Sequence, residues 1–384
     1  MIFGAFCGAL GFFLAKPVLA LMGNEAKLLE LASVYTRIYF LGLPVIALTN
    51  FAVAVLHAEG DSKTPFVVLT LSGVVNVILN LVLVLVADLS VEGVAIATVV
   101  ANAVSAVLLI ARLLKDKTAC RLRLKKLRIH MKTLGRIVEV GFPAAVQSSL
   151  FSLSNMLIQS SIVKVNNAVA GAEAAYQPVV KGNSACSSVE GFIYTVIDSV
   201  GKASVSFVGQ NAGAKKYDRL SEFLKIAYLT SFVVGVISPA IVLLLRNPLL
   251  ALYGIRLDKI AYDTAVTRML IMFVPYFTIA FMQLGSGVLQ GLGKAVSASV
   301  SSLIGACLFR VIWIFTVFAA KPTIEIIYLS YPISWVLVAL SHFIMIRKTL
   351  KKLRASASET AEEGKAANEN AETAAEAAIS VDKK

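Results

Sequence analysis

The residues whose types and spacing could do chemistry are Glu190, Tyr194, Asp198 and Lys202, each four positions after the last. Four-residue spacing puts side chains on one face of an α-helix, so two acids, a phenol and an amine would share a stripe. Within an apolar segment, a carboxylate of this kind can exchange a proton or help to hold Na⁺ when its exposure changes. The stripe therefore predicts an ion- or substrate-binding site centred on Glu190.

Two charges of this stripe also have a purely structural interpretation. Asp198 and Lys202 can neutralise each other, which would only hold helices together, and Lys202 could also extend to the membrane surface. Glu190 has no basic residue four positions away. A functional role is therefore favoured for Glu190, while both interpretations stay open for the pair.

A second group of polar side chains lies in the preceding apolar segment. Gln147, Asn155 and Gln159 have amides that could contact a ligand. Amides between membrane helices also form interhelical hydrogen bonds, which is the alternative.

A third polar group lies near the start of the chain. Asn76 and Asn80 are four residues apart, and Thr98 lies on the next apolar segment. Together they could form a small polar pocket, or they could join helices by hydrogen bonds.

Three arginines lie in or beside apolar segments. Arg310 lies in the middle of its segment and needs a carboxylate or carbonyl partner. Arg37 and Arg268 lie near the ends of theirs, so they are interpreted as structural anchors.

The composition is that of an integral membrane protein. Of 384 residues, 58% are hydrophobic and 15% are charged, and the mean hydropathy is +0.79. Too few polar residues are present to cover a soluble surface, which excludes a secreted disulfide scaffold, a cytosolic enzyme and a soluble nucleic-acid binder. The spacing of the four cysteines matches no metal site, and no HExxH motif, Walker A motif or Ser-His-Asp set occurs. We expect no enzymatic activity, no cofactor and no resident metal.

The positions above lie on ten predicted transmembrane helices. A hydrocarbon core about 30 Å thick needs about 20 apolar residues per helix, and backbone polar groups in lipid must be satisfied within the segment. The fold class is therefore all-α and polytopic. The sixth segment is the weakest, because it carries three charges. The predicted segments are 2–21, 32–56, 66–87, 93–111, 137–163, 183–210, 226–245, 269–289, 298–320 and 324–346.

The distribution of basic residues predicts the orientation. Residues 112–136 hold ten Lys and Arg, and basic residues also follow the sixth and tenth segments on the same side. Cytoplasmic loops of membrane proteins carry such an excess. We therefore expect a multi-pass plasma-membrane protein in the lipid bilayer, with both termini in the cytoplasm.

An internal repeat appears at an offset of 231 residues. It aligns the first four segments with the last four, so the two copies have the same orientation. Parallel repeats are typical of secondary transporters. Two helices would then be missing before Met1, while a natural ten-helix protein is the alternative. The matches are Pro17 with Pro248, Gly23 with Gly254, Thr36-Arg37 with Thr267-Arg268, Pro44 with Pro275, Gly60 with Gly291 and Lys63 with Lys294.

The repeat also predicts the domain organisation. Residues 1–115 form an incomplete N-terminal lobe of four helices, and residues 116–136 a basic cytoplasmic linker. Residues 137–348 form a C-terminal lobe of six helices. Residues 349–384 are rich in Ala and Glu at their end and are interpreted as a disordered or transiently helical cytoplasmic tail.

Several short motifs resemble those of one family. They are Gly60-Asp61-Ser62-Lys63-Thr64-Pro65, Asn76-Val77-Ile78-Leu79-Asn80, Gly93-Val94-Ala95-Ile96-Ala97-Thr98, Gly141-Phe142-Pro143 and the stretch 208–216, VGQNAGAKK. Together they resemble the multidrug and toxic compound extrusion (MATE) family over about residues 1–350. The resemblance implies two six-helix lobes about a pseudo-two-fold axis normal to the membrane, with this chain beginning at the third helix. It also implies rocker-switch antiport, in which Na⁺ or H⁺ enters as cationic, amphipathic drugs leave.

The sequence departs from the family pattern at its acids. Known members carry an essential acid on the first helix, which the resemblance places before Met1. The polar pair of the fifth helix is often Asn then Asp, and here it is Asn76 then Asn80. The Glu and Asp of some sodium-coupled members have no clear counterpart, since the fifth segment has only Glu139 near its end. Glu190 remains the best candidate acid, with Na⁺ held near it only transiently.

These observations predict an antiporter that exports drugs or other amphipathic or cationic organic compounds in exchange for Na⁺ or H⁺, acting as a monomer without a nucleic-acid partner. Two alternatives stay open. A flippase for a lipid-linked saccharide precursor would need a cavity rich in Arg and Lys for pyrophosphate. An inactive truncated transporter would show no response of a substrate gradient to Na⁺ or pH.

Overall fold

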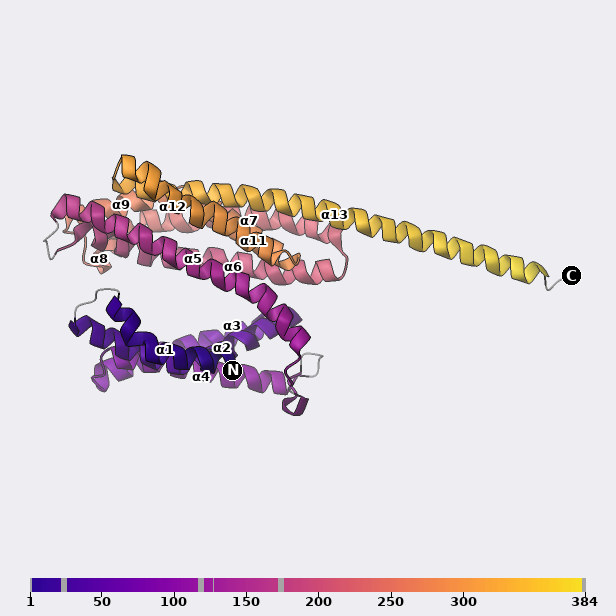
Figure 1. The fold of residues 1–384 in the computed structure, drawn as a ribbon, viewed down its shortest axis with the longest axis horizontal. Helices are drawn as coiled ribbons and strands as arrows, with labels where there is room; N and C mark the ends of the chain where they lie inside the picture. The colour runs from indigo at the N-terminus through magenta and orange to yellow at the C-terminus, as the bar shows by residue number, and fades with distance from the viewer. Residues whose placement is uncertain (1, 22–25, 117–120, 127, 172–175, 382–384) are drawn as a thin grey trace. The chain divides into compact units, whose positions relative to one another are not determined.

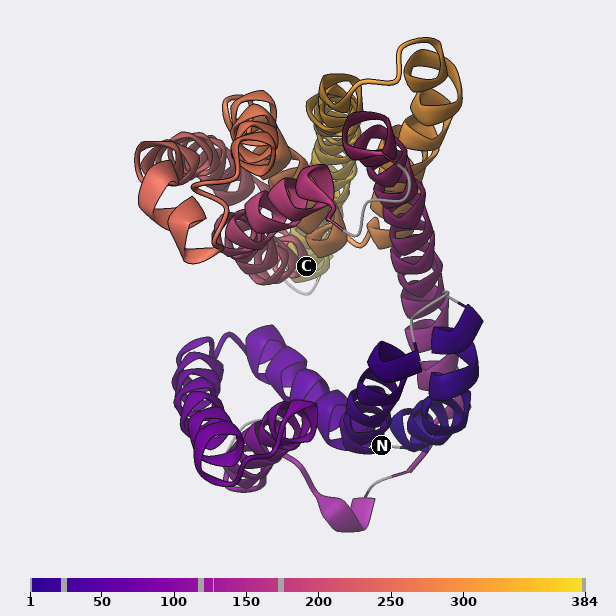
Figure 2. The same cartoon turned by 90° about the vertical axis from the view of Figure 1, so that its left-hand side faces the viewer.

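The structure is a computed structural model that describes residues 2–21, 26–116, 121–126, 128–171 and 176–381. Every regular element in these ranges is a helix. The chain divides into two compact units, Met1–Ile129 and His130–Lys384. Figure 1 labels their helices, and Figure 2, in which most helices are seen end-on, shows that the helices of each unit run alongside one another.

The first unit is built on four long helices. α2 packs against α1 and α4, and α3 packs against α4. A small core of Ala52, Leu56, Leu109 and Leu113 joins α2 to α4, and the Ser72 hydroxyl donates to the Ala101 carbonyl between α3 and α4. The helices are α1 (Ile2–Leu21), α2 (Ala26–Glu59), α3 (Lys63–Leu81) with its π-helical continuation η1 (Val82–Val86), and α4 (Val91–Leu114), followed by the 3₁₀ turn η2 (Leu124–Lys126).

The turn between α2 and α3 is held by a carboxylate. Gly60 has a φ of 96°, which costs little without a Cβ. Asp61 then accepts from the Thr64 backbone N–H at 2.9 Å and from its hydroxyl at 2.7 Å, and Arg112 of α4 lies 3.5 Å away. The Thr64 hydrogen bonds, followed by Arg112, hold the pKa of the Asp61 carboxyl below its usual range.

The second unit places α6 and α10 at its centre. α10 packs against α6, α7 and α13, while α6 also contacts α5, α7 and α9. The elements are α5 (Met131–Ala170), α6 (Pro178–Gly213), α7 (Tyr217–Leu244), α8 (Arg246–Leu252), α9 (Lys259–Phe273), α10 (Phe277–Gly291), α11 (Ala295–Ser302), η3 (Leu303–Leu308), α12 (Phe309–Trp313), η4 (Ile314–Phe318) and α13 (Ile324–Val381).

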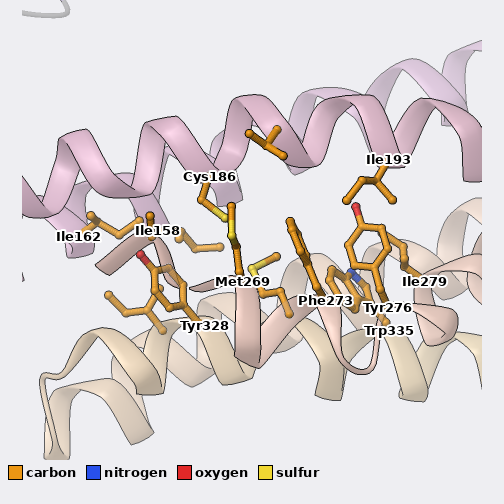
Figure 3. Close-up of a cluster of buried hydrophobic side chains, with 14 of the residues drawn as sticks. Ile158, Ile162, Cys186, Ile193, Met269, Phe273, Tyr276, Ile279, Tyr328 and Trp335 are labelled. Carbon is orange, nitrogen blue, oxygen red and sulfur yellow. The ribbon is translucent and has the colours of Figure 1, made fainter. Parts of the chain in front are cut away.

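The core of this unit lies where these helices meet. Met269 and Phe273 of α9 lie between Cys186 of α6 and the large rings of Tyr328 and Trp335 on α13, as Figure 3 shows. Gly182 allows α6 to approach α9 closely, because a Cβ at this position would lie 2.1 Å from the Ala261 carbonyl oxygen. This close approach brings the polar residues of α6 next to those of α9.

The membrane-spanning segments largely follow the prediction. Among the described residues, seven helices are long and apolar enough to cross a membrane, and the bent pair α9–α10 makes an eighth. The eighth predicted segment is therefore corrected, since α9 and α10 meet at 53° around Pro275. Proline cannot donate its backbone nitrogen and disfavours a helical residue before it. α5 and α6 are long but too polar to meet the same criterion. The chain is a multi-pass membrane protein.

The helices that the predicted repeat pairs have the same neighbours in both units. In the first unit α2 contacts α1 and α4, and α3 contacts α4. In the second unit α10, the counterpart of α2, contacts α7 and α13, and α11, the counterpart of α3, contacts α13. The predicted repeat pairs these helices, while the pseudo-two-fold relation stays a prediction.

The unit boundary at Ile129 lies within the predicted linker, residues 116–136. α13 runs to Val381, where a disordered or transiently helical tail was predicted; Ala and Glu favour a helical backbone.

Candidate functional site

One polar cavity of about 350 Å³ lies within the second unit, and we refer to it as the charged cavity. It is lined by α5, α6, α9 and α13. Its polar lining residues are Asn155, Gln159, Asn183, Ser187, Glu190, Tyr194, Arg268 and Tyr331. Glu190 and Tyr194 of the predicted α6 stripe and Asn155 and Gln159 of the α5 amides therefore face the same space, whereas Asp198, Lys202 and Gln147 do not line it.

An ion pair dominates the charged cavity. The Glu190 carboxylate lies 2.6 Å from a terminal nitrogen of Arg268, and their side chains are only 15% and 7% exposed. The Tyr276 hydroxyl donates to the other Glu190 oxygen at 3.4 Å. A buried carboxylate without a partner is costly, so this pairing explains how Glu190 is tolerated in an apolar segment.

Arg268 has further partners besides Glu190. It donates to both the backbone carbonyl and the side-chain oxygen of Asn183, at 3.2 Å and 2.5 Å. The Tyr328 ring lies 5.7 Å from its guanidinium, and the Tyr328 hydroxyl donates to the same Asn183 side-chain oxygen at 3.2 Å. Asn183 follows Gly182, the point of closest approach between α6 and α9. The packing of these helices therefore fixes the guanidinium from two sides.

A second cavity of about 490 Å³, the amide cavity, lies between α5, α6, α10 and α11. Its polar lining residues are Gln147, Ser148, Tyr194, Gln283, Ser286, Gln290, Ser299 and Ser302, and Phe151 and Met282 add apolar surface. Tyr194 lines both cavities. The Gln283 amide donates to the Tyr194 hydroxyl and to Asp198, each at 2.9 Å. Asp198 in turn pairs with Lys202 at 2.6 Å.

The comparisons with known proteins agree with this fold. A sequence model of the MatE family matches residues 1–82 and 143–316, which is more than half of the chain. The chain belongs to the MatE family. This MatE chain is 28% identical over 261 residues to the probable multidrug resistance protein YoeA of Bacillus subtilis, covering 65% of this chain and 53% of that protein. It is 25% identical over 303 residues to the probable multidrug resistance protein YpnP of the same organism, covering 79% and 65%.

Solved structures show the same fold. An outward-facing MATE family transporter of the MOP superfamily superposes with a TM-score of 0.80 at 18% identity, over 92% of this chain and 78% of that one. The MatE chain thus spans between about half and two thirds of the length of the two relatives from Bacillus subtilis.

The structure places the remaining predicted residues of this MatE protein as follows. Asn80 donates to Asn76 at 3.0 Å, whereas the Thr98 hydroxyl donates to Val94 of its own helix at 2.9 Å. No hydrogen bond joins Thr98 to the amide pair in the described part of the first unit, so these three residues form no shared hydrogen-bonded cluster. Thr98 satisfies its hydroxyl locally, as helical threonines often do.

Arg310 is buried, and its partner differs from the one expected. Its Nε donates to the Ser334 hydroxyl at 3.0 Å, and its guanidinium lies 4.2 Å from the centre of the Tyr331 ring. The prediction of a carboxylate or carbonyl partner for Arg310 is therefore wrong: its partners are a hydroxyl and the face of an aromatic ring. A delocalised guanidinium can stack on such a ring.

Arg268 is the site residue that sequence reasoning missed. Its interpretation as an anchor did not predict its contact with Glu190. A signal was present, because Glu190 has no basic residue four positions away, Arg268 has no acidic residue four positions away, and both lie in or beside membrane segments. Charges in such segments usually pair with one another, so the two could have been matched.

Proposed function

We propose that this protein is a secondary antiporter that exports drugs or other amphipathic organic compounds in exchange for Na⁺ or H⁺. Membership of the MatE family and the names of its relatives, probable multidrug resistance proteins, support this proposal. The observation that carries it is the partly buried Glu190 carboxylate, which lies on the wall of a polar cavity within a membrane-embedded helix bundle.

Glu190 is the coupling residue in this proposal. Its carboxylate binds Arg268 in one state and takes up H⁺, or contacts Na⁺, in another. When Glu190 is neutralised, Arg268 keeps its hydrogen bonds to Asn183 and its contact with the Tyr328 ring. The guanidinium therefore retains partners in both states, which lowers the cost of breaking the ion pair. Neutralisation of Glu190 removes the ion pair between α6 and α9 and so loosens their contact. This loosening favours the change between the two states of rocker-switch alternating access.

The test is efflux by the full chain with Glu190→Gln. We expect at least a tenfold loss of efflux driven by an imposed Na⁺ or pH gradient, with unchanged amounts of protein in the membrane. Glu222→Gln is the matched control, since Glu222 is an exposed carboxylate on α7 outside both cavities. Wild-type efflux by Glu190→Gln would remove Glu190 from the mechanism.

Localisation and assembly are also proposals. The basic loops support a plasma-membrane protein with cytoplasmic termini. We also propose that it acts as a monomer and binds no nucleic acid. We do not propose the flippase alternative. Among the residues that line the two cavities of the second unit, Arg268 is the one strong cation, and it is already paired with Glu190. A pyrophosphate group would require free cationic donors.

A further inference from the structure

Basic side chains gather at one end of the second unit, where α7 begins and α13 leaves the apolar part of the bundle. Nine of the eleven charged residues within 215–225 and 347–354 are basic, and Asp218 and Glu222 are the two acids. We call the Lys and Arg residues of these two segments the basic patch. All nine side chains are exposed. Among the described residues, no ion pair joins any of them to an acid, so the patch carries unbalanced positive charge.

Two kinds of contact hold the two segments of the basic patch together. A terminal nitrogen of Arg354 on α13 donates to the Ser221 hydroxyl of α7 and to the Tyr217 carbonyl at 3.5 Å. Beneath them, Leu220 of α7 and Leu350 of α13 belong to one buried apolar cluster. The basic side chains therefore stand on two helices that are packed against each other.

α13 separates its charged residues from its apolar residues at this end. Ile346 and Leu350 are buried, whereas Lys348, Lys351 and Lys352 are exposed. Residues three or four positions apart share a helix face, so the three lysines lie together on the side opposite the buried pair. Three ammonium groups therefore point away from the protein core from neighbouring positions.

The basic patch lies at the depth of the lipid headgroups. α7 and α13 are both apolar enough to cross a membrane, and their predicted hydrocarbon segments, 226–245 and 324–346, border the patch. At 1.5 Å per residue, the segment 347–354 extends about 12 Å beyond the hydrocarbon, while the headgroup layer on each side is about 5–8 Å thick. The guanidinium of Arg347 lies 4.3 Å from the centre of the Phe343 ring, which holds it at this boundary.

The phosphate of a phospholipid matches this patch in charge and in depth. Ammonium and guanidinium groups donate charge-assisted hydrogen bonds to phosphate oxygens. An anionic phospholipid brings a net negative charge, whereas the headgroup of a zwitterionic phospholipid carries its own cation, which competes with the lysines. Clusters of Lys and Arg just outside a membrane helix attract anionic lipids for this reason.

We propose that the basic patch is a binding surface for the headgroups of anionic phospholipids, and that Lys348, Lys351 and Lys352 supply its main contacts. The bound phosphates offset the repulsion among the cations where α13 packs on α7. The inference does not require that the protein transports anything, so it can fail or succeed independently of the proposed antiport.

The experiment measures which phospholipid stays with the purified full chain. The chain, in a neutral detergent, is incubated with equal amounts of phosphatidylglycerol, which is anionic, and phosphatidylcholine, which is zwitterionic, both with the same acyl chains. The retained lipids are then quantified by mass spectrometry. We expect retained phosphatidylglycerol to exceed phosphatidylcholine roughly fivefold or more at low salt. The triple variant Lys348→Gln, Lys351→Gln, Lys352→Gln should lower this ratio to about twofold or less, and an unchanged ratio would overturn the inference.

A second triple variant is the matched control. Arg123→Gln, Lys125→Gln and Arg128→Gln together remove three exposed basic side chains from the segment around η2 of the first unit, and this variant should keep the ratio of the wild type. An equal loss in both triple variants would show that overall positive charge selects the lipid, and the basic patch would lose its role.

Two measurements on the wild type cover the case in which the first triple variant does not fold. Raising the salt concentration should lower the ratio, because salt screens exposed charges, and a ratio that does not respond to salt counts against the inference. Added glycerol phosphate, which has no acyl chains, should leave the ratio unchanged. Displacement of phosphatidylglycerol by this compound would show that the patch takes soluble phosphate esters, which would refute the assignment to lipid.

Discussion

Replacing Gly182 by alanine tests the helix contact on which the ion pair depends. The added Cβ would lie 2.1 Å from the Ala261 carbonyl oxygen, 2.9 Å from its carbonyl carbon and 3.0 Å from its Cα. All three atoms belong to the backbone, so no side chain can rotate away. An ordinary contact between carbon and oxygen is about 3.3–3.6 Å, and α6 and α9 must therefore separate by roughly 1 Å or more.

The magnitude follows from two opposing effects. Overpacking of this kind costs about 1–3 kcal/mol or more, while alanine gains about 1 kcal/mol over glycine in a helix. Because the backbone contact in Gly182→Ala is so short, we take the upper end and expect a net loss of about 2 kcal/mol. For a unit of this size, that loss lowers the Tm by roughly 4–8 °C.

Gly209 of the same helix supplies the matched control. A Cβ there would lie 3.7 Å from the nearest backbone oxygen, that of Gly291, which is an ordinary contact. Gly209→Ala should therefore keep or raise the Tm. The assay is thermal unfolding of each purified variant in the same detergent. A Tm for Gly182→Ala equal to or above that of Gly209→Ala would refute the close packing of α6 on α9.

Two further predictions concern single polar groups. Asp61→Ala removes the acceptor for Thr64 and should cost about 1 kcal/mol at neutral pH. Since the pKa of Asp61 is lowered in the folded state, its stabilisation is present above the unfolded pKa of about 3.9 and is lost as pH falls through the lower folded value. The Tm difference from the wild type should shrink below about pH 4. His342 is buried on α13, and its Nδ1 lies 3.2 Å from the Met282 carbonyl of α10. His342→Phe removes this contact between α13 and α10 and should cost about 0.5–1.5 kcal/mol, measured as a loss of Tm.

Each of these predictions has a result that contradicts it. For Asp61, a Tm difference that stays constant between pH 7 and pH 3 would show that the carboxylate charge does not contribute. For His342, a Tm in the phenylalanine variant as high as that of the wild type would show that the ring serves only to fill space. His342→Gln is the control, because its amide can still donate to Met282.

The positions of most membrane helices follow from the sequence because apolar length is a local property. The predicted bounds of the first helix, residues 2–21, are those of α1. The break at Pro275 was not predicted, since the apolar run continues through it on both sides. The polar stripe of α6 was also readable from its four-residue spacing, and the structure places Glu190 and Tyr194 on cavity walls.

The partners of these residues were not predictable in the same way. Which side chain meets Glu190 depends on the helix that packs against α6, and Arg268 is 78 positions away in sequence. The pocket expected from Asn76, Asn80 and Thr98 shows the same limit. Two of these residues share a helix and bond to each other, while the third satisfies itself within its own helix.

The order of Glu190 and Arg268 along the chain affects how the protein enters the bilayer. α6 is synthesised before α9, and it is more polar than the helices that are apolar enough to cross a membrane. An ionised carboxylate at the centre of a lone helix costs several kcal/mol in lipid. Pairing with Arg268 offsets this cost, and Arg268 lies on α9, which is synthesised later. We therefore expect the membrane insertion of α6 to be less favourable in a chain that ends before α9 than in the full chain.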